Sequence, residues 1–539
     1  MSENPYVGFF GEREQKPLSY KGDNHLVTIG PPGTGKSSGL YVPNLALLDR
    51  SILVIDPKGE LAAITAQHRK RFGPVFVLNP FQVLADRLPF MRSCGFNPLA
   101  ALNPASPRFV DDCKALAQGI VKVEGVDPHW SRSAQSLVAA LMMHARRTRG
   151  AAANLVMVRD LLTETRGHYI EDGRPIPTGL DATILQMVGS DFAPIYRRAG
   201  KYVNDTKETS SIISTAEAQS EFLDSPPIGA DLSQANSFDF ADMRRMNLTV
   251  YLVLPFEEIA THANWLRLIV AAALRALTQN PDQVGRPRVL FMLDEFANLG
   301  YLEAIRSAMA AARGFRIQMW PGVQNIGQLK ELYGDNWETF LAGAGFQGFF
   351  TPRDMTTARY ISERCGLKDT TQRSRSHDHA GNISHGYHTG QQPRLSINEV
   401  FGIPDRMAAC FQESMGDGFF CEVPHYTDSR LYWCRGLAAN PYDGAKLTHH
   451  TPAPLTLPNA NNYAPPAPVV TSTKDESTIC GGTMIDKNGQ AIDPLAALGW
   501  SEKTPKPTAI ANTFADIRSN KNGIIENPIA RLNKGLWGE

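Results

Sequence analysis

Short apolar runs alternate with helix-like stretches over the first eighty residues of the chain. The runs at 25–29, 51–55 and 75–78 predict strands, and helices are expected at 36–48 and 60–72. Strands that are apolar throughout are buried on both faces, and their alternation with helices is typical of a parallel sheet that helices cover on both sides. The pattern therefore predicts an α/β domain.

The pattern changes after about residue 97. Between residues 104 and 224 there is almost no strand signal. One helix start stands out, with Asp127 as the expected N-cap, Pro128 at the first helical position and apolar residues at helical spacing from Trp130 to Ala145. This stretch predicts an all-α insertion in the α/β domain.

The α/β pattern then returns and ends in a proline-rich tail. Further strands are expected at 248–254, 289–293, 316–320, 345–350 and 418–423, with a helix at 262–278. Residues 437–539 hold 11 of the 37 prolines and are expected to be extended or disordered. The predicted organisation is a nucleotide-binding domain in two parts (1–98 and 229–436), an all-α insertion (99–228) and a flexible tail (437–539).

Composition narrows the possible classes of protein. Lys plus Arg and Asp plus Glu both number 54, so a net charge of zero indicates no general nucleic-acid affinity, and any basic surface must be local. The seven cysteines show no paired spacing, which favours a reducing compartment over a disulfide framework or a zinc module. No signal peptide and no apolar run of about 18 residues is visible, so no transmembrane helix is predicted.

The segment between the first strand and the first helix has the spacing G-x-x-x-x-G-K-S of a phosphate-binding P-loop. In such a loop, backbone N–H groups and the helix N-terminus surround phosphate oxygens. Lys36 would reach the β- and γ-phosphates, and Ser37 would bind Mg²⁺. The strand–loop–helix context argues against an incidental Gly/Pro-rich turn. The residues expected to bind the cofactors ATP and Mg²⁺ are Gly30, Pro31, Pro32, Gly33, Thr34, Gly35, Lys36, Ser37 and Ser38.

Two adjacent carboxylates follow the apolar run at 289–293. Asp294 would hold Mg²⁺ through its water shell, and Glu295 would polarise the attacking water. The alternative is an ordinary solvated loop, since acidic residues often end strands. Repeated ATP hydrolysis requires a base such as Glu295, whereas nucleotide binding alone does not.

The order of these motifs resembles the TraG/TraD family of type IV coupling proteins over roughly residues 20–430. The matching stretches are the P-loop, Ile52 to Ile55 followed by Asp56-Pro57-Lys58-Gly59-Glu60, Asp127-Pro128-His129-Trp130, Leu293-Asp294-Glu295-Phe296 and Arg313-Gly314-Phe315-Arg316-Ile317. The resemblance implies a RecA-like P-loop ATPase with a parallel-rich central sheet. It also implies that Gln324 lies near the γ-phosphate, as a third catalytic residue beside Lys36 and Glu295.

The family further implies a homohexamer that brings a relaxase or relaxosome with single-stranded DNA, or a protein effector, to a type IV secretion channel during conjugation. Members typically begin with a transmembrane pair, so this chain is expected to be a form without that region, either naturally or as part of a longer protein. We therefore expect a cytoplasmic protein that is peripheral at the cytoplasmic face of the bacterial inner membrane and is held there by an integral partner.

Three weaker signals leave alternatives open. Arg353, Arg359 and Arg364 are candidates for an arginine finger between subunits, although each is more typical of a structural or surface arginine. The basic runs 146–149 and 197–201 could contact DNA phosphates, but residues 103–225 hold 14 basic and 15 acidic residues, a net charge of −1 that favours solvated helix faces.

The third weaker signal is a histidine cluster, His377, His379, His385 and His388, which could bind a metal but lacks a standard ligand framework. Two alternative functions also remain for the chain as a whole. One is a DNA pump of the FtsK/HerA kind without a secretion partner. The other is a docking receptor for protein effectors that uses ATP binding for assembly.

Overall fold

The computed structural model describes most of the 539-residue chain. The described ranges are 2–10, 16–123, 128–171, 174–279, 287–377, 383–413, 415–416, 418–443, 478–480 and 483–485. For 372–377, 383–388, 478–480 and 483–485 the backbone alone is described. The chain divides into two compact units, Met1–Pro458 and Asn459–Glu539. In the second unit the described residues form a short antiparallel hairpin of β16 (Thr478–Cys480) and β17 (Thr483–Ile485).

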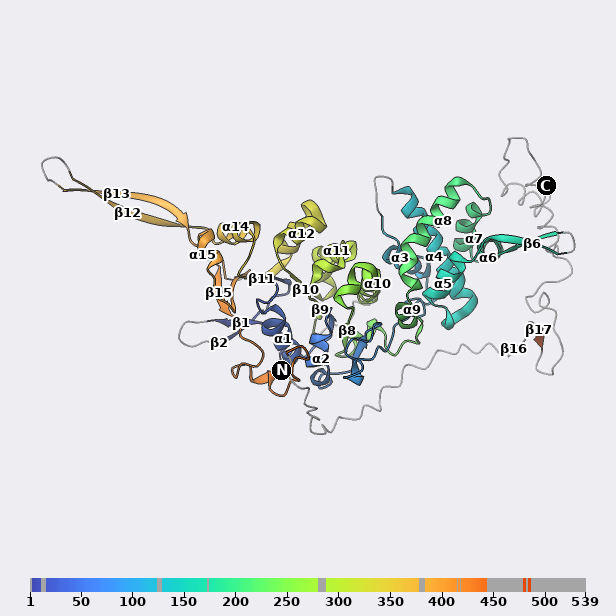
Figure 1. Cartoon of the computed structure of the whole chain (residues 1–539), viewed down its shortest axis with the longest axis horizontal. Coiled ribbons are helices and arrows are strands. Elements are labelled where there is room, and N and C mark those ends of the chain that lie inside the picture. The colour runs from blue at the N-terminus through green and yellow to red at the C-terminus, as the bar shows by residue number, and fades with distance from the viewer. Residues whose placement is uncertain are drawn as a thin grey trace. The chain divides into compact units, whose positions relative to one another are not determined.

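An eleven-stranded sheet forms the centre of the first unit (Figure 1). In spatial order its strands are β2 (Lys16–Ser19), β1 (Tyr6–Phe10), β15 (Phe419–Glu422), β14 (Met407–Gln412), β11 (Ala344–Phe350), β3 (His25–Ile29), β10 (Ile317–Val323), β9 (Val289–Leu293), β4 (Ile52–Ile55), β8 (Thr249–Leu252) and β5 (Val75–Leu78). The seven strands from β11 to β5 pair in parallel, whereas the flank from β2 to β11 pairs antiparallel. The sheet confirms the predicted α/β fold class with its parallel-rich centre.

The parallel strands place the predicted site residues at one edge of the sheet. Strands β3, β9 and β10 are neighbours that run in the same direction, so the segments that follow their carboxyl ends emerge together. The P-loop follows β3, the Asp294-Glu295 pair follows β9, and Gln324 follows β10. The backbone N–H of Gly30 donates a 3.0 Å hydrogen bond to the carbonyl of Val323, which fixes the loop against β10.

Helices cover both faces of the sheet. They are a π-helical turn Ser37–Tyr41 that continues into α1 (Val42–Leu47), α2 (Glu60–Arg69), α10 (Phe256–Gln279), α11 (Glu303–Ala311), α12 (Ile326–Tyr333), α13 (Glu338–Ala342), α14 (Met355–Arg364) and α15 (Ile397–Phe401). The parallel strands are mostly apolar, as expected for strands whose two faces are both buried. One contact in this core joins Tyr41 to Trp320, whose rings meet edge to face at 5.4 Å.

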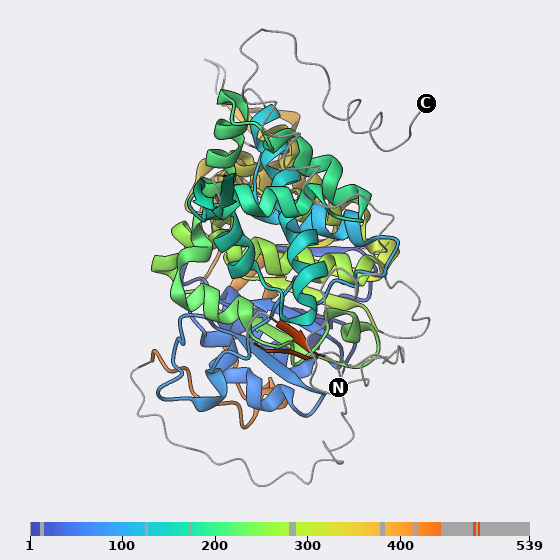
Figure 2. The ribbon, with the colours of Figure 1, turned by 90° about the vertical axis from the view of Figure 1, so that its right-hand side faces the viewer.

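A helical region lies between β5 and β8 in sequence and beside α10 in space (Figure 1). Its helices, coloured cyan to green, face the viewer in Figure 2. They are α3 (Phe109–Ile120), α4 (His129–Arg149), α5 (Leu155–Thr163), α6 (Gly179–Val188), α7 (Ala193–Ala199), α8 (Lys207–Ser220) and α9 (Pro226–Ser233). The buried stripe of α4 includes Ala134, Leu137, Val138 and Leu141, as the spacing predicts.

Several predicted elements differ in detail. Asp127, the expected N-cap of the long helix, lies outside the described residues, and Pro128 directly precedes the first helical residue, His129. The insertion also contains a hairpin, β6 (Gly167–Glu171) and β7 (Arg174–Thr178), so the expectation of an entirely α-helical stretch was wrong. Two prolines in β7 and the largely exposed faces of both strands remove the apolar alternation that reveals a strand.

The N-terminal segment contributes β1 and β2 to the sheet, two strands that are not among those predicted above. A second hairpin, β12 (Leu367–His377) and β13 (Ile383–Pro393), projects from the sheet (Figure 1). The side chains of the histidine cluster lie outside the described residues, as do residues 444–477, 481–482 and 486–539 of the predicted flexible tail. Among the described residues, no helix is long and apolar enough to cross a membrane.

Candidate nucleotide-binding site

The P-loop has the backbone geometry that its glycines permit. Gly33 and Gly35 adopt φ values of +83° and +100°, which side chains rarely tolerate. A Cβ atom at position 35 would lie 2.5 Å from a guanidinium nitrogen of Arg406, so this glycine also makes room for an arginine. The hydroxyl of Thr34 donates a 2.8 Å hydrogen bond to the carbonyl of Pro31 and braces the turn.

Lys36 lies inside the loop with 5% of its surface exposed. Its Nζ donates hydrogen bonds to the carbonyls of Gly30 and, at 3.3 Å, of Pro31. Burial lowers the pKa of Lys36, while the negative charges of Asp294 and Glu295 oppose that shift. The ammonium group is thus held within electrostatic reach of both carboxylates that follow β9.

Ser37 and Asp294 meet directly, although they follow different strands. The Ser37 hydroxyl donates a 2.8 Å hydrogen bond to Oδ2 of Asp294, and Oδ1 of the same carboxylate accepts a 3.0 Å hydrogen bond from the backbone N–H of Glu295. Burial raises the pKa of Asp294, and the hydrogen bond from Ser37 lowers it in part. A hydroxyl beside a carboxylate offers the hard oxygen ligands that Mg²⁺ prefers.

Glu295 and Gln324 form the second polar pair of the site. The Gln324 Nε2 donates a 3.0 Å hydrogen bond to Oε2 of Glu295, and the Gln324 backbone N–H donates at 2.9 Å to Gln328. Glu295 has left-handed backbone angles, φ 50° and ψ 42°, which cost a non-glycine residue about 1–3 kcal/mol. Such a conformation persists where the surrounding structure fixes it, and here it aims the carboxylate at Gln324.

Arg406 belongs to the site and was missed in the sequence. Its Nη1 donates a 2.9 Å hydrogen bond to the hydroxyl of Ser38, and its guanidinium lies against Gly35. Arg406 precedes β14 directly and has φ 63°. Nothing in the local sequence marks this arginine, because it reaches the P-loop through the antiparallel flank of the sheet. It adds a positive charge to the loop from within the same chain.

The three expected arginine-finger candidates lie elsewhere. Arg353 and Arg359 are exposed, before and on α14 respectively, and Arg364 stacks over the ring of Phe411 at 4.9 Å. Within the described residues, no hydrogen bond or ion pair joins any of them to the P-loop. A role across a subunit interface stays a prediction.

The Asp56 to Glu60 motif lies beside the site, after β4. Asp56 is buried and accepts a 2.8 Å hydrogen bond from the backbone N–H of Ala62, and burial raises its pKa to about 7. The irregular segment 424–443 covers this region: the Tyr442 hydroxyl donates to the carbonyl of Lys58 at 2.6 Å, and Asn440 donates to Glu60 at 2.9 Å. The cover was not predicted because its regular secondary structure among the described residues is limited to a short 3-10 turn, Tyr432–Cys434.

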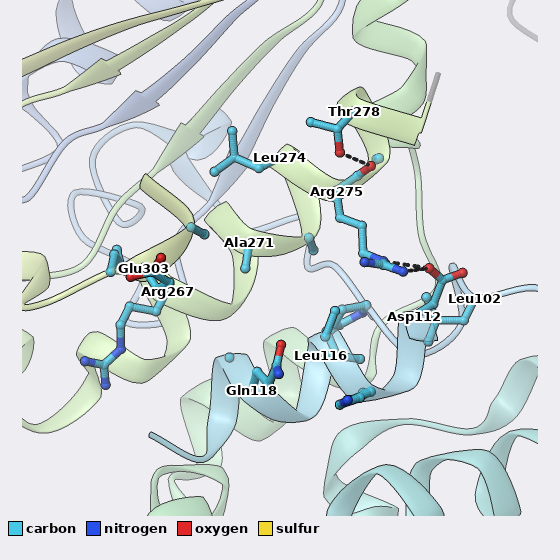
Figure 3. Close-up of a pocket in the computed structure, with 18 of the residues that line it drawn as sticks. Leu102, Asp112, Leu116, Gln118, Arg267, Ala271, Leu274, Arg275, Thr278 and Glu303 are labelled. Carbon is cyan, nitrogen blue, oxygen red and sulfur yellow. Dashed lines mark hydrogen bonds and ion pairs between the residues drawn. The ribbon is translucent and has the colours of Figure 1, made fainter. Parts of the chain in front are cut away.

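A large cleft lies away from the P-loop. It has a volume of about 1650 Å³. It lies between helices α3 and α4 of the helical region on one side and helices α10 and α11, which cover the sheet, on the other (Figure 3). Arg275 of α10 bridges the two sides by donating a 2.6 Å hydrogen bond to Asp112 of α3, which also accepts from Gln279 at 2.7 Å. Its charged lining residues are Lys114, Lys122, Arg132, Arg198, Arg267, Arg275, Asp112, Asp239 and Glu303.

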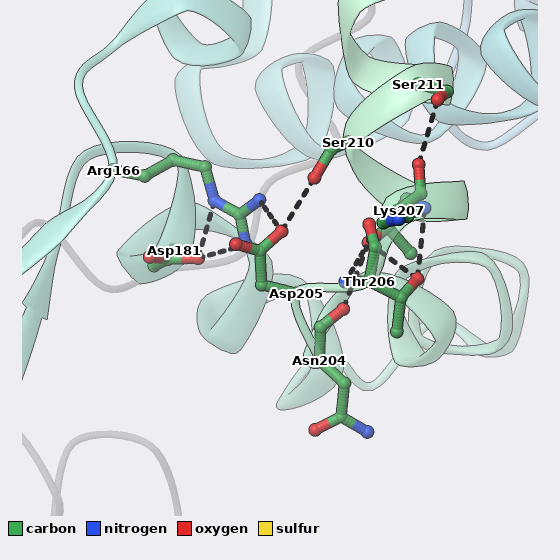
Figure 4. A network of polar contacts seen from close by, with 9 residues as sticks. Arg166, Asp181, Asn204, Asp205, Thr206, Lys207, Ser210 and Ser211 are labelled. Atoms are coloured by element: carbon green, nitrogen blue, oxygen red, sulfur yellow. Dashed lines mark hydrogen bonds and ion pairs between the residues drawn. The ribbon is translucent and has the colours of Figure 1, made fainter.

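Two arginines of the basic run 146–149 contact other residues of the helical region. Arg146 donates to the carbonyls of Leu102 and Ala100, and Arg147 pairs with Asp191 at 2.9 Å. Figure 4 shows a similar internal network, in which Arg166 contacts both Asp181 and Asp205. These contacts favour the structural interpretation of those arginines, whereas Arg198 lines the cleft.

The sheet order and the loop geometry define a RecA-like P-loop fold. The family described as "Type IV secretory system Conjugative DNA transfer" matches residues 6–407, and this chain belongs to that family. The match covers most of the chain and includes the P-loop, the helical region and the Asp294-Glu295 pair.

Relatives and solved structures agree with this assignment. The conjugal transfer protein TraG of Escherichia coli is 27% identical over 432 residues, which is 75% of this chain and 66% of that protein. The protein VirD4 of Agrobacterium fabrum is 27% identical over 76% of this chain and 60% of its own length. The chain thus spans just under two thirds of such relatives. The bacterial conjugative coupling protein TrwB, in a form named TrwBdeltaN70, has the same fold, with a TM-score of 0.55, 15% identity and coverage of 76% of this chain and 86% of that structure.

Proposed function

We propose that the chain is an ATP-hydrolysing coupling protein that recruits a DNA, nucleoprotein or protein substrate and helps to move it into a type IV secretion channel. The observation that carries the proposal is the convergence of Lys36, the Ser37–Asp294 pair and the Glu295–Gln324 pair at one edge of the sheet. A binding protein that does not hydrolyse ATP would not require the second pair. Family membership supports the secretion context, and TrwB has been solved in complex with ADP and Mg²⁺.

The residues present fit Mg²⁺ and ATP. The loop's backbone N–H groups and Lys36 would hold the phosphates, and Ser37 would bind the metal directly while Asp294 holds its water shell. When bound, Mg²⁺ neutralises developing negative charge on the phosphates. Glu295 would accept the proton of the attacking water, and Gln324 would orient that water through its side-chain amide. The 3.0 Å contact between Glu295 and Gln324 supports their acting on one water.

The partners belong to the same proposal. We expect a homohexamer that engages a relaxase or relaxosome with single-stranded DNA and reaches the inner membrane through a channel component. The cleft between the helical region and the sheet contains more basic than acidic side chains and is a surface where such a substrate could bind. An FtsK/HerA-like pump and an effector-docking receptor are the alternatives that the experiment below separates.

The test is steady-state ATP turnover by the full chain and by Lys36→Ala, each alone, with single-stranded DNA, with a relaxase and with a protein effector. Binding of the full chain to channel components is measured in parallel. We expect Mg²⁺-dependent turnover that DNA or relaxase increases and that Lys36→Ala abolishes. Absence of turnover under every condition would contradict the proposal. Stimulation by a protein effector but not by DNA favours the docking receptor, and stimulation by DNA with no binding to channel components favours the pump.

A further inference from the structure

Three arginines gather at the edge of the sheet opposite the P-loop. Arg50, Arg288 and Arg316 precede β4, β9 and β10 by one or two residues. These three strands are parallel neighbours, so their amino ends meet at one edge. The nucleotide site lies at the carboxyl ends of the same strands, so the arginine cluster is separated from it by the length of the sheet.

The three side chains line a small cavity, which we call the arginine pocket. Its volume is about 60 Å³, and its lining residues are Glu3, Asn4, Pro5, Gly22, Arg50, Pro287, Arg288, Arg316 and Gln318. A single water needs roughly 10–15 Å³ of such volume, so the pocket holds a few waters or one small polyatomic anion. Glu3 is the one acidic residue in this described lining, against three arginines.

Arg50 is the most enclosed of the three, with 3% of its surface exposed. Its Nη2 donates a 2.7 Å hydrogen bond to Gln318, but its buried Nε has no hydrogen-bond partner among the described residues. Burial, followed by the positive charges of Arg288 and Arg69, lowers the pKa of Arg50 to about 9, while Glu3 opposes the shift. An enclosed guanidinium with an unused donor is costly, and an anion would compensate for it.

Arg288 supplies a second unused donor to the same pocket. One of its terminal nitrogens pairs with Asp23, while its buried Nε also lacks a hydrogen-bond partner in the described part of the chain. The side chain is 21% exposed, so it is more accessible to solvent than the enclosed Arg50. Guanidinium groups present planar, paired donors that match the oxygens of phosphate and carboxylate groups.

We propose that the arginine pocket binds one phosphate-sized oxyanion, held by Arg50 and Arg288 with Arg316 adding positive charge. The site differs from the P-loop in its residues and in the edge of the sheet that it occupies. Anion binding at this site does not depend on ATP hydrolysis. The proposal therefore holds even if the proposed function is wrong.

The test uses the full chain carrying Lys36→Ala, which weakens phosphate binding at the P-loop. Inorganic phosphate is titrated by calorimetry against chloride at matched ionic strength, and the thermal unfolding midpoint is followed in parallel. We expect one saturable site whose affinity falls at least about tenfold in Arg288→Gln. Arg147→Gln is the matched control, because it also removes an arginine that pairs with an aspartate but lies in the helical region.

A second variant changes the affinity in the opposite direction. Asp23→Asn removes the carboxylate that competes for Arg288, so phosphate should bind several-fold more tightly. Absence of phosphate binding in the Lys36→Ala chain would show that the pocket holds water alone. Binding that Arg288→Gln and Asp23→Asn both leave unchanged would place the phosphate elsewhere. Either result overturns the proposal.

Discussion

The hydroxyl of Ser37 donates a 2.8 Å hydrogen bond to the carboxylate of Asp294, although 257 positions separate the two residues in sequence. The contact exists because β3 and β9 flank β10 in a parallel sheet, so the loops that follow them meet at one edge. It joins the hydroxyl proposed to bind the metal to the carboxylate proposed to hold the metal's water shell.

Replacing Asp294 with Asn should uncouple nucleotide binding from Mg²⁺. Asn keeps an acceptor for Ser37 but removes the negative charge. The ratio of nucleotide affinity with Mg²⁺ to nucleotide affinity without Mg²⁺ should therefore fall about tenfold or more. Fluorescent nucleotide titrations with Mg²⁺ and with a chelator measure that ratio. Asp335→Asn, at an exposed position, is the control. An unchanged Mg²⁺ dependence would show that Asp294 does not act on the metal.

Glu295→Gln should separate hydrolysis from binding. Gln preserves the size of the side chain but cannot accept a proton, so turnover should fall by about 10²-fold or more while nucleotide affinity stays within about twofold. Turnover and equilibrium binding are measured on the same preparation, with Glu331→Gln on α12 as the exposed control. Equal losses of turnover and affinity would instead indicate damage to the loop.

Arg406→Gln should weaken nucleotide binding by about tenfold, because it removes a cation that contacts Ser38 and lies against Gly35. The loss should be larger for ATP than for ADP if the guanidinium faces the terminal phosphate. Competition titrations with both nucleotides distinguish these outcomes. The exposed Arg435→Gln controls for loss of charge. An unchanged nucleotide affinity in Arg406→Gln would show that Arg406 contributes only packing against the loop.

Asp231→Asn should alter the pH dependence of stability. Burial raises the pKa of Asp231 to about 6, although Ser93 and Trp265 donate hydrogen bonds to its carboxylate. The folded state therefore binds this proton more tightly than the unfolded state, whose pKa is close to 4. The free energy of unfolding should fall as the pH rises from about 4 to about 6, by up to about 3 kcal/mol, and this contribution stays lost above that range.

Urea unfolding across that pH range measures the difference. In Asp231→Asn the decrease due to this carboxylate should vanish, whereas the exposed Asp335→Asn should follow the parent chain. Parallel curves for Asp231→Asn and the parent would show that folding does not raise the pKa of this carboxylate.

The sequence alone determined the P-loop, the α/β class and the position of the helical insertion. Each depends on local information: the glycine spacing from Gly30 to Ser37, the fully apolar strands such as Val289–Leu293, and the helical spacing after Trp130. The same information indicated that Asp294 and Glu295 follow a buried strand. It could not give the distance from either carboxylate to Ser37 or Gln324.

The tertiary structure alone decided which distant residues meet. Arg406 reaches Ser38 because β14 and β15 add an antiparallel flank to the sheet, and the segment 424–443 then covers Lys58 and Glu60. The arginine pocket likewise depends on β4 lying beside β9 and β10 in space, although β4 is far from both in sequence. Strand order is set by packing and hydrogen bonding over the whole chain, so local residue patterns carry no record of it.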